Sequence, residues 1–411
     1  MALLLLPSHP ADAGSLPSPD QDGIIVALRS AAVLHPTIRS RVEEFRALGF
    51  DLSSEEARRY PSLSLQAQSM TDDQTQVFAR LQQPIWVGGR IDGAIDQAGA
   101  KLQVGKTSLL AVQRQVMEDT AATYAALQGI RQRLKAADLN VQEHEKLLTL
   151  ISRRQVGSIA SEADVRLARS RLTLAVSQRE QLRGQLTRTI TDLQALTQMP
   201  LDAAEPVPEA LMALPERSSI VPGVTDASAA VRQRQLEVDV ARTEAELRKA
   251  DMMPSLYARF DQDIYSSNKV GTLPVETRAG IVLEGSLEGV GFSGWNRVRS
   301  ADSRVDAARR DVESARNEAR RRAQALLAEV ESLQVIMQSN EDLVSATEGT
   351  LASFMRQYDA GRKSWVDVLN AQREFSDARL SLEQTRSSLQ ENRLRLAVEL
   401  GMLDSAAEIK P

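Results

Sequence analysis

Tyr60-Pro61-Ser62-Leu63 recurs 193 residues later as Met253-Pro254-Ser255-Leu256. Further along, Gly89 is matched by Gly294 at an offset of 205 residues. Self-similarity at a nearly fixed spacing is typical of a duplicated structural unit. The change of offset places about 12 extra residues between the proline and the glycine of the second copy. Because an insertion of this kind fits a hairpin and not a helix, the prolines are expected to open pairs of strands.

Each proline is followed by two stretches in which polar and apolar side chains alternate. In the first copy they cover residues 61–70 and 75–86, and in the second they cover 254–265 and 275–286. Alternation with a period of two predicts a half-buried strand. Each stretch holds about 10 residues, the length of a tilted transmembrane strand. The residue before a proline disfavours helix, so a helix predicted from 37 to 58 ends just before the first strand.

Two very long helices are predicted after the strand pairs. Residues 90–156 and 296–358 contain no proline, and each range spans ~100 Å as one α-helix. Shorter helices at about 160–198 and 364–402 are expected to run back beside them. Apolar side chains of the first long helix recur at heptad spacing, which predicts a coiled-coil seam. The seam consists of Leu127, Ile130, Leu134, Ala137, Val141, His144, Leu148 and Ile151.

The repeat divides the chain into two similar units. The N-terminal segment holds Ala11-Asp12-Ala13, which resembles a signal-peptide cleavage site. It is interpreted as the remainder of a signal peptide, with an ordinary disordered terminus as the alternative. The proposed organisation is, in order, a residual signal peptide (1–20), a first repeat (21–198), a proline-rich linker (199–224), a second repeat (225–403) and a C-terminal tail (404–411).

Composition excludes several classes of function. The 411 residues hold 50 Lys and Arg against 55 Asp and Glu, which argues against nucleic-acid binding. The absence of cysteine excludes disulfides and thiolate metal sites. His9, His35 and His144 are too dispersed in sequence for a metal site or a catalytic dyad. No combination of an acid, a base and a nucleophile indicates a catalytic site, so neither an enzyme nor a cofactor is predicted. His144 occupies a position of the heptad seam and is interpreted as a packed residue.

The predicted strands raise the question of a membrane. No run of 18 apolar residues exists, so no transmembrane helix is expected. A closed β-barrel is then the remaining structure that can cross a bilayer, because open sheet edges cannot face lipid. Four strands are too few to close such a barrel. Trp86, Tyr257, Tyr265, Phe292 and Trp295 lie at or near strand ends, where aromatic side chains form interfacial girdles.

The order of motifs resembles a known family. Besides the duplicated Pro-Ser-Leu, the chain has Pro84-Ile85-Trp86-Val87-Gly88-Gly89-Arg90 after the second strand. It also has Tyr358-Asp359-Ala360-Gly361-Arg362-Lys363-Ser364-Trp365-Val366-Asp367-Val368-Leu369-Asn370-Ala371-Gln372-Arg373 at the second-copy turn. These segments resemble the TolC-type outer-membrane efflux family over nearly the whole chain after residue 20. The resemblance implies a mostly α fold with a small β part. It also implies a homotrimer with a 12-stranded transmembrane β-barrel on a long periplasmic α-helical barrel.

The resemblance also implies a role in export from the bacterial outer membrane and periplasm. The partners would be outer-membrane lipid, a periplasmic adaptor, an inner-membrane ABC transporter or other pump, and exported cargo. Residues 159–168 and 293–298 look most like members that serve type I secretion of large adhesins. The alternatives are a duct of a multidrug or small-molecule efflux pump, and a periplasmic coiled-coil adaptor. A soluble coiled-coil scaffold would explain the heptads but not the paired strands.

The resemblance assigns gate residues to the turn of the second copy. Asp367 matches an acidic ring that narrows the periplasmic entrance, and Asn370 stands one turn on, where an acid often occurs. Tyr358 and Lys363 match positions that brace the closed entrance, and Asp164 is the nearest candidate for their acidic partner. Gly157 is matched with Gly361 at an offset of 204 residues, whereas the serine–aspartate pairs of the two turns match at 203. The acid expected six residues after Gly157 is Ala163, and Asp164 stands one place later, so this slip of one residue puts Asp164 in doubt as the partner. Helix capping is the competing explanation for Asp164 and Asp367, since each follows a serine by three residues. Amphipathic packing is the competing explanation for Tyr358.

The two turns are also the expected docking tips for an adaptor. The tip residues are Val156, Gly157, Ser158, Ala360, Gly361 and Arg362. An ordinary glycine C-cap is the competing explanation, because glycine ends helices without steric cost. The glycines are therefore expected to serve the fold, and their neighbours to make the contacts.

Overall fold

The computed structural model describes residues 23–70, 74–201, 205–268, 271–272, 274, 276–285 and 291–409. The segment interpreted as a residual signal peptide lies outside the described residues. Within them the two copies repeat one order of elements: helix, two long strands, long helix, shorter helix. The duplicated plan expected from the sequence is therefore confirmed.

The two copies have similar elements, and among the described residues the second has one additional short strand, β4 (Gly271–Thr272). The first copy contains α2 (Pro36–Ala57), β1 (Ser62–Met70), β2 (Gln74–Trp86), α3 (Arg90–Val156) and α4 (Glu162–Thr197). The second contains α6 (Ala229–Ala250), β3 (Ser255–Asn268), β4 (Gly271–Thr272), β5 (Thr277–Glu284), α7 (Phe292–Asp359) and α8 (Trp365–Glu399). The helix predicted from residue 296 begins at Phe292, directly after Gly291, whose φ of 88° starts the turn into it.

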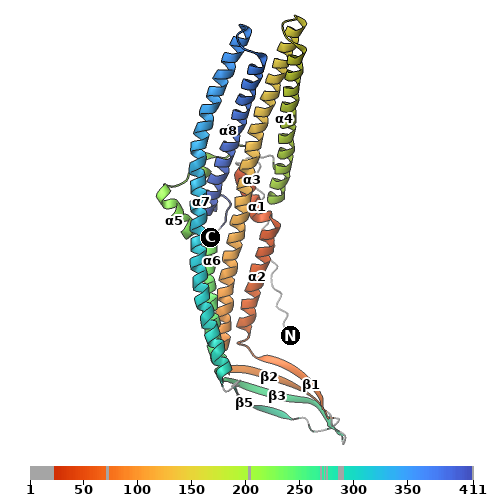
Figure 1. The fold of residues 1–411 in the computed structure, drawn as a ribbon. Coiled ribbons are helices and arrows are strands. Elements are labelled where there is room, and N and C mark those ends of the chain that lie inside the picture. Colours follow the sequence, from red (N-terminus) through yellow and green to blue (C-terminus); the bar gives the residue numbers. More distant parts are fainter. Residues whose placement is uncertain are drawn as a thin grey trace.

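The molecule is a bundle of long helices with a sheet at one end (Figure 1). Helices α3 and α7 have 67 and 68 residues, so each is ~100 Å long. They run from the sheet to two hairpin turns at the opposite end. Helices α2 and α4 lie along α3 one after the other, and α6 and α8 lie along α7 in the same way. Two short helices thus lie end to end beside one long helix in each copy.

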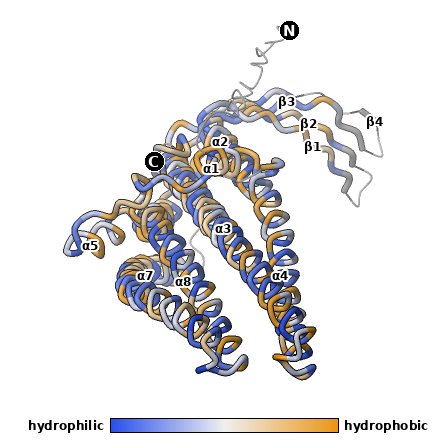
Figure 2. The backbone as a smooth tube through the Cα atoms, turned by 90° about the horizontal axis from the view of Figure 1, so that it is seen from above, coloured by the Kyte–Doolittle hydropathy of each residue, from blue (hydrophilic) through white to orange (hydrophobic). Residues whose placement is uncertain are grey.

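All long strands are antiparallel and form one sheet. The order is β1-β2-β3, with β5 on the far side of β3, so β1 and β5 are the edges. The sheet extends away from the helices to one side (Figure 2). Within the part of the chain that the structure describes, no helix is both long and apolar enough to cross a membrane.

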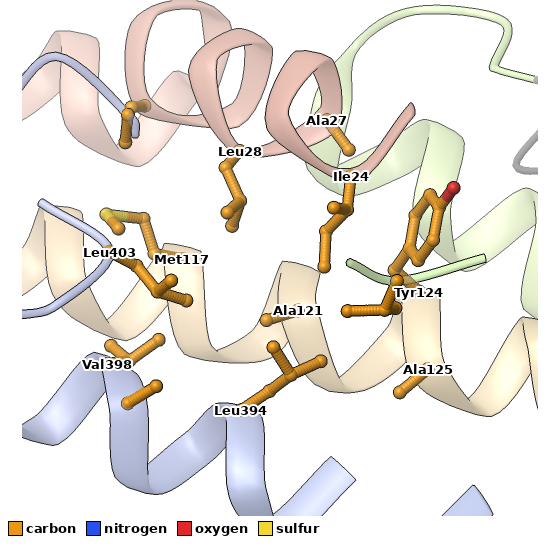
Figure 3. Packing of buried hydrophobic residues seen from close by; sticks show 14 of the residues in the cluster. Ile24, Ala27, Leu28, Met117, Ala121, Tyr124, Ala125, Leu394, Val398 and Leu403 are labelled. Carbon is orange, nitrogen blue, oxygen red and sulfur yellow. The ribbon is translucent and has the colours of Figure 1, made fainter. Parts of the chain in front are cut away.

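A core near the middle of the bundle joins segments from both ends of the chain. Helix α1 (Gly23–Leu34) was not predicted from the sequence. Its Ile24 and Leu28 pack against Met117 of α3 and Leu394 of α8, and all four side chains are fully buried (Figure 3). Burial of such side chains contributes about 1.5–3 kcal/mol each. This core fixes the first and second copies side by side.

The linker and the C-terminal segment are more ordered than their composition suggested. The linker contains η1 (Glu209–Met212), and α5 (Arg217–Ala227) begins in it and includes Pro222. Ile220 of α5 is buried against α7. In the segment expected as a tail, Ile409 is buried in the central core. There too the Arg114 guanidinium holds Asp404 at 2.6 Å. Burial against other parts of the molecule explains the ordered structure of both segments, and the proline content of a sequence does not predict such burial.

The predicted seam of α3 faces its neighbours. Leu127, Ile130, Ala137, Val141, His144 and Ile151 are buried, whereas Leu134 and Leu148 are half-buried. Gly129 lies on the same helix where α8 comes closest, because a Cβ atom there would lie 2.0 Å from Ser387 Oγ. The close contact between α3 and α8 therefore requires glycine at this position.

Candidate functional site at the hairpin tips

The candidate site consists of two helical hairpin turns at the end of the molecule opposite the sheet (Figure 1). One turn joins α3 to α4, and the other joins α7 to α8. Both helices end with the same hydrogen bonds. The Ile159 N–H donates to the Arg154 carbonyl at 2.9 Å, and the Arg362 N–H donates to the Gln357 carbonyl at 2.8 Å. Such a hydrogen bond encloses a residue whose backbone is in the left-handed conformation, with positive φ, and it ends many helices.

The left-handed residue differs between the turns. It is Ser158 in the first copy, with φ of 58°, and Gly361 in the second, with φ of 72°. Their offset is 203 residues, so the expected pairing of Gly157 with Gly361 is wrong at the backbone level. Gly157 has φ of −76°, which any residue adopts. Only Gly361 is the glycine C-cap that the sequence suggested, because the slip of one residue moves Ser158 into the matching place.

Both return helices start with a complete capping box. The Ser161 N–H and Oγ donate to Asp164 Oδ2 at 3.0 and 2.7 Å, and the Asp164 N–H donates to Ser161 Oγ at 3.1 Å. Ser364 and Asp367 repeat the arrangement at 3.1, 2.8 and 3.2 Å. Hydrogen bonds from Ser364, and secondarily the charge of Lys363, lower the pKa of the Asp367 carboxyl. Capping is therefore an observed role of both aspartates.

Asp367 and Asn370 lie one turn apart on α8 and are both partly exposed. The two residues between them, Val368 and Leu369, are fully buried against the other helices of the tip. The burial pattern turns the Asp367–Asn370 face away from the packed interior. This face is partly exposed in the single chain.

Tyr358 and Lys363 make contacts within the tip. The Tyr358 ring lies 5.2 Å from the Trp365 ring, centroid to centroid. Lys363 Nζ lies 4.3 Å from the centroid of the Phe354 ring. Within the described part of the chain, no hydrogen bond or ion pair joins Asp164 to either Tyr358 or Lys363. The structure therefore brings Tyr358 and Lys363 to one tip and leaves Asp164 in its own capping box.

Arg154 joins the two hairpins, and the sequence analysis missed it. Its guanidinium is 2.6 Å from Asp359 Oδ1. It also lies 4.4 Å above the Tyr358 ring. These are attractive geometries for an ion pair and for a cation on an aromatic face. A basic residue in the last turn of a helix is ordinarily explained by the helix dipole, so the sequence held no specific signal for this contact.

A shared apolar cluster holds the two turns together below their outer surface. It includes Ile151 of α3, Val165 of α4, and Trp365 and Leu369 of α8, all of them buried. The outermost residues are exposed, and Val156 and Ile159 keep 86% and 77% of their surface open. Gly157, Ser158, Ala360, Gly361 and Arg362 are exposed as well. The expected docking residues thus form the outer end of a rigid tip.

The functional groups of the tip are charged and aromatic side chains. Among the described residues, no group of three or more His, Asp or Glu side chains is arranged to hold a metal ion. The side chains that meet there are arginine, lysine, aspartate and aromatic residues.

A match to a family model identifies the family of this chain. Residues 27–197 and 224–402 match the model of a family described as outer membrane efflux protein. The chain belongs to the outer membrane efflux protein family. Its members are transport ducts of the bacterial outer membrane that extend into the periplasm. The resemblance to TolC-type proteins is thereby confirmed.

Solved structures of outer-membrane channels share the fold. A membrane protein from Pseudomonas aeruginosa aligns with a TM-score of 0.80 at 16% identity, covering 92% of this chain and 90% of that chain. The outer membrane protein VceC from Vibrio cholerae aligns with a TM-score of 0.77 at 16% identity, covering 92% and 96%. The MtrE outer membrane channel of Neisseria gonorrhoeae aligns with a TM-score of 0.75 at 16% identity, covering 92% and 89%. No curated protein sequence matches the chain significantly.

Proposed function

We propose that three copies of this chain form one export duct, in which the sheets close into a 12-stranded transmembrane barrel. The two faces of the sheet carry this proposal. Neighbouring strands place Leu63, Leu81 and Phe260 in one row, and all three are exposed in the single chain. Leu65, Ile281 and Leu283 are exposed to 68%, 70% and 67%. An exposed apolar face of this size suits lipid.

The opposite face of the sheet is polar and charged. Arg80 and Asp261 face each other across β2 and β3 at 2.7 Å. Arg259 pairs with Glu284, and Arg278 pairs with Asp263 at 3.4 Å. Alternation between a lipid face and a polar interior is the pattern of barrel strands. The edges of β1 and β5 have no partner among the described strands, and edge-to-edge pairing of three sheets supplies one.

Charge substitutions on the two faces test the barrel. Ile281→Arg puts a charge on the apolar face and is expected to destabilise the membrane-inserted protein by about 2–4 kcal/mol. Ser64→Arg puts the same charge on the polar face and is the matched control. Outer-membrane fractionation and heat-modifiable migration in gels measure insertion. Equal insertion of the two variants would contradict the assignment of the faces.

The hairpin tips are proposed as the periplasmic gate, with Asp367 and Asn370 facing the pore. Their shared open face on α8 supports this, as does the tight packing of the residues between them. Tyr358, Lys363 and Arg154 would hold the second hairpin in place, and Asp164 would cap the first. A threefold ring of Asp367 carboxylates would favour cations.

Conductance in planar bilayers tests the gate. Asp367→Ala is expected to lower cation preference and to change the pH dependence of conductance. Asp164→Ala removes the same kind of cap from the first copy and is the matched control. Unchanged conductance and selectivity in Asp367→Ala, or the same change in both variants, would remove Asp367 from the ring.

The outer ends of the turns are proposed to dock a periplasmic adaptor, through which the duct reaches an inner-membrane ABC transporter or other pump. Val156, Ser158, Ala360 and Arg362 offer exposed apolar and basic surface there, while Gly157 and Gly361 shape the turns. Type I secretion of a large protein such as an adhesin is the proposed task, supported by the motifs at 159–168 and 293–298. Efflux of small molecules is the second candidate, and the family description supports it only in naming efflux.

Imaging and a deletion strain separate these proposals. Single particles of the detergent-solubilised protein are expected to show threefold symmetry and a helical span of ~100 Å. A monomeric rod would contradict the duct. In a deletion strain, loss of a large secreted protein with normal drug tolerance supports type I secretion. Increased drug sensitivity with normal secretion supports small-molecule efflux instead.

A further inference from the structure

A polar groove lies between α4 and α8, with α3 as its floor. Its volume is about 320 Å³. The floor includes Asn140 and His144 of α3. Arg171 and Gln178 of α4 line one wall, and Arg373 of α8 lines the other. The groove lies along the helices and apart from the capping boxes and the sheet.

His144 is a buried polar group in this groove. Its side chain keeps only 4% of its surface, and its Nδ1 has no hydrogen-bond partner in the described structure. Burial lowers the pKa of His144, the charge of Arg171 lowers it further, and Glu143 opposes both effects. The sequence interpretation of His144 as packed is correct for its position. An unpartnered buried nitrogen is nevertheless costly in a purely structural seam.

The two arginines of the groove also lack a carboxylate in direct contact. Neither Arg171 nor Arg373 forms an ion pair among the described residues, and Arg171 Nε is buried without a hydrogen-bond partner. On the same helix, Arg166 and Arg179 have carboxylate partners at 2.6 and 2.7 Å. Arg171 and Arg373 thus bring two guanidinium groups without a carboxylate partner to one groove.

Asn140 completes a set of donors. Its Oδ1 accepts hydrogen bonds from Ser376 Oγ and from Gln372 Nε2. With the oxygen engaged, the amide N–H groups are what Asn140 has left to offer. Asp377 is the carboxylate that lines the groove. Two arginines against one aspartate leave the lining with a net positive charge.

We propose that this groove binds a small oxyanion of the phosphate or sulfate class between Arg171 and Arg373, above His144. Guanidinium groups match the oxygen spacing of such anions and bind them with charge-assisted hydrogen bonds. The anion would supply the missing counter-charge and tie α4 to α8 across α3. The site requires neither an open pore nor a bound partner.

Thermal unfolding of the full-length protein in detergent tests the site with inorganic phosphate as the probe. Phosphate is compared with chloride at equal ionic strength and pH. Wild type and the control Arg169→Gln, an exposed arginine on the same helix, are expected to gain about 2 °C or more. Arg171→Gln is expected to gain nothing. Because each variant is compared with itself in chloride, a change in its basal stability does not affect the result. No gain in wild type, or an equal gain in Arg171→Gln, overturns the proposal.

Titration of His144 provides a second measurement. The chain has only three histidines, and His144→Gln identifies the signal of this residue in protein labelled at histidine Cε1. Bound phosphate is expected to raise the pKa of His144, because the anion offsets the charge of Arg171. Replacing phosphate by sulfate keeps the tetrahedral geometry and should give the same shift, whereas acetate tests a planar anion. A pKa of His144 that phosphate leaves unchanged contradicts binding at this site.

Discussion

The two hairpin tips have the same backbone and different chemistry. At an offset of 203 residues they share the helix end, the left-handed residue and the capping box. The side chains at matching places differ. The first copy has Gln155 and Glu162, where the second has Tyr358 and Trp365. Local capping thus preserves the turn, while the second copy carries the side chains that pack and brace the tip.

The largest expected effect is the loss of the tryptophan that distinguishes the second tip. Trp365 is 3% exposed and packs in the shared tip cluster. Trp365→Ala is expected to destabilise the tip by about 3–5 kcal/mol. Chemical unfolding, followed with hydrogen exchange at the tips, measures the change.

Glu162→Ala alters the matching place in the first copy and is expected to change little. Trp365→Phe keeps most of the apolar surface and removes an indole N–H that has no partner in the described structure. This variant is expected to cost under about 1.5 kcal/mol. An equal loss from Glu162→Ala and Trp365→Ala would contradict the difference between the tips.

Substitutions at the two residues with positive φ, Ser158 and Gly361, should change the stabilities of the two turns in opposite directions. Gly361→Ala puts a side chain at φ of 72° and is expected to destabilise the second turn by about 1 kcal/mol. Ser158→Gly relieves the same constraint in the first turn and is expected to stabilise it by up to about 1 kcal/mol. Hydrogen exchange of the amides at residues 157–159 and 360–362 reports each turn. Destabilisation by both substitutions would show that Ser158 is held there by a contact of its side chain.

Removing the link between the tips is expected to have a smaller effect. Arg154→Ala removes the ion pair with Asp359 and the contact with the Tyr358 ring. Because Asp359 is largely exposed, about 1 kcal/mol is expected. The effect should shrink at high salt. A double-mutant cycle with Asp359→Asn measures the coupling, and exposed Arg153→Ala is the control. A coupling of zero at low salt would show that the apolar cluster alone joins the hairpins.

The smallest expected effect is a pH dependence of the second cap. The pKa of Asp367 is lowered in the folded protein, so the ionised carboxylate stabilises the start of α8. This contribution is complete well above the ordinary carboxyl pKa of about 3.9. It is lost as the pH falls through the lower folded-state value. The protection of the amides at residues 365–368, measured as their exchange rate relative to the intrinsic rate at the same pH, is expected to fall below about pH 4.

Asp367→Asn is expected to abolish this loss of protection at low pH. Asp164→Asn, in the first copy, should leave the profile at the start of α8 unchanged. An identical acid profile in wild type and Asp367→Asn would show that another group controls the fraying of α8.

Much of the fold was predictable because its signals are local. The prolines, the alternating strands and the long proline-free stretches define the order of elements. The capping boxes were visible as Ser161 with Asp164 and Ser364 with Asp367, since a cap is complete within four residues. Helix α1 was missed because its 12 residues are apolar on nearly all sides. So short an apolar run can belong to a buried strand or to a buried helix, and the docking of α1 on α3 and α8 explains its helical state.

The site was predictable in place and less so in its contacts. The sequence placed Tyr358, Lys363, Asp367 and Asn370 at one tip, and the structure has them there. It did not reveal that Arg154 reaches Asp359. It also paired Gly157 with Gly361, because identical residues were matched where the backbone matches Ser158 to Gly361.

The sequence by itself determined the duplication, most of the element types and the helix caps, because each depends on residues close together in the chain. Only the tertiary structure decided which charged and apolar side chains meet between helices. Arg322 of α7, for example, binds Glu118 of α3 at 2.7 Å and Glu399 of α8 at 2.9 Å. Such contacts depend on the rotation and axial register of helices ~100 Å long, where a shift of one residue moves a side chain by about 100° around its helix. A local pattern does not fix that register. The register is fixed by tertiary packing, such as that of Gly129 against Ser387 and of α1 in the central core.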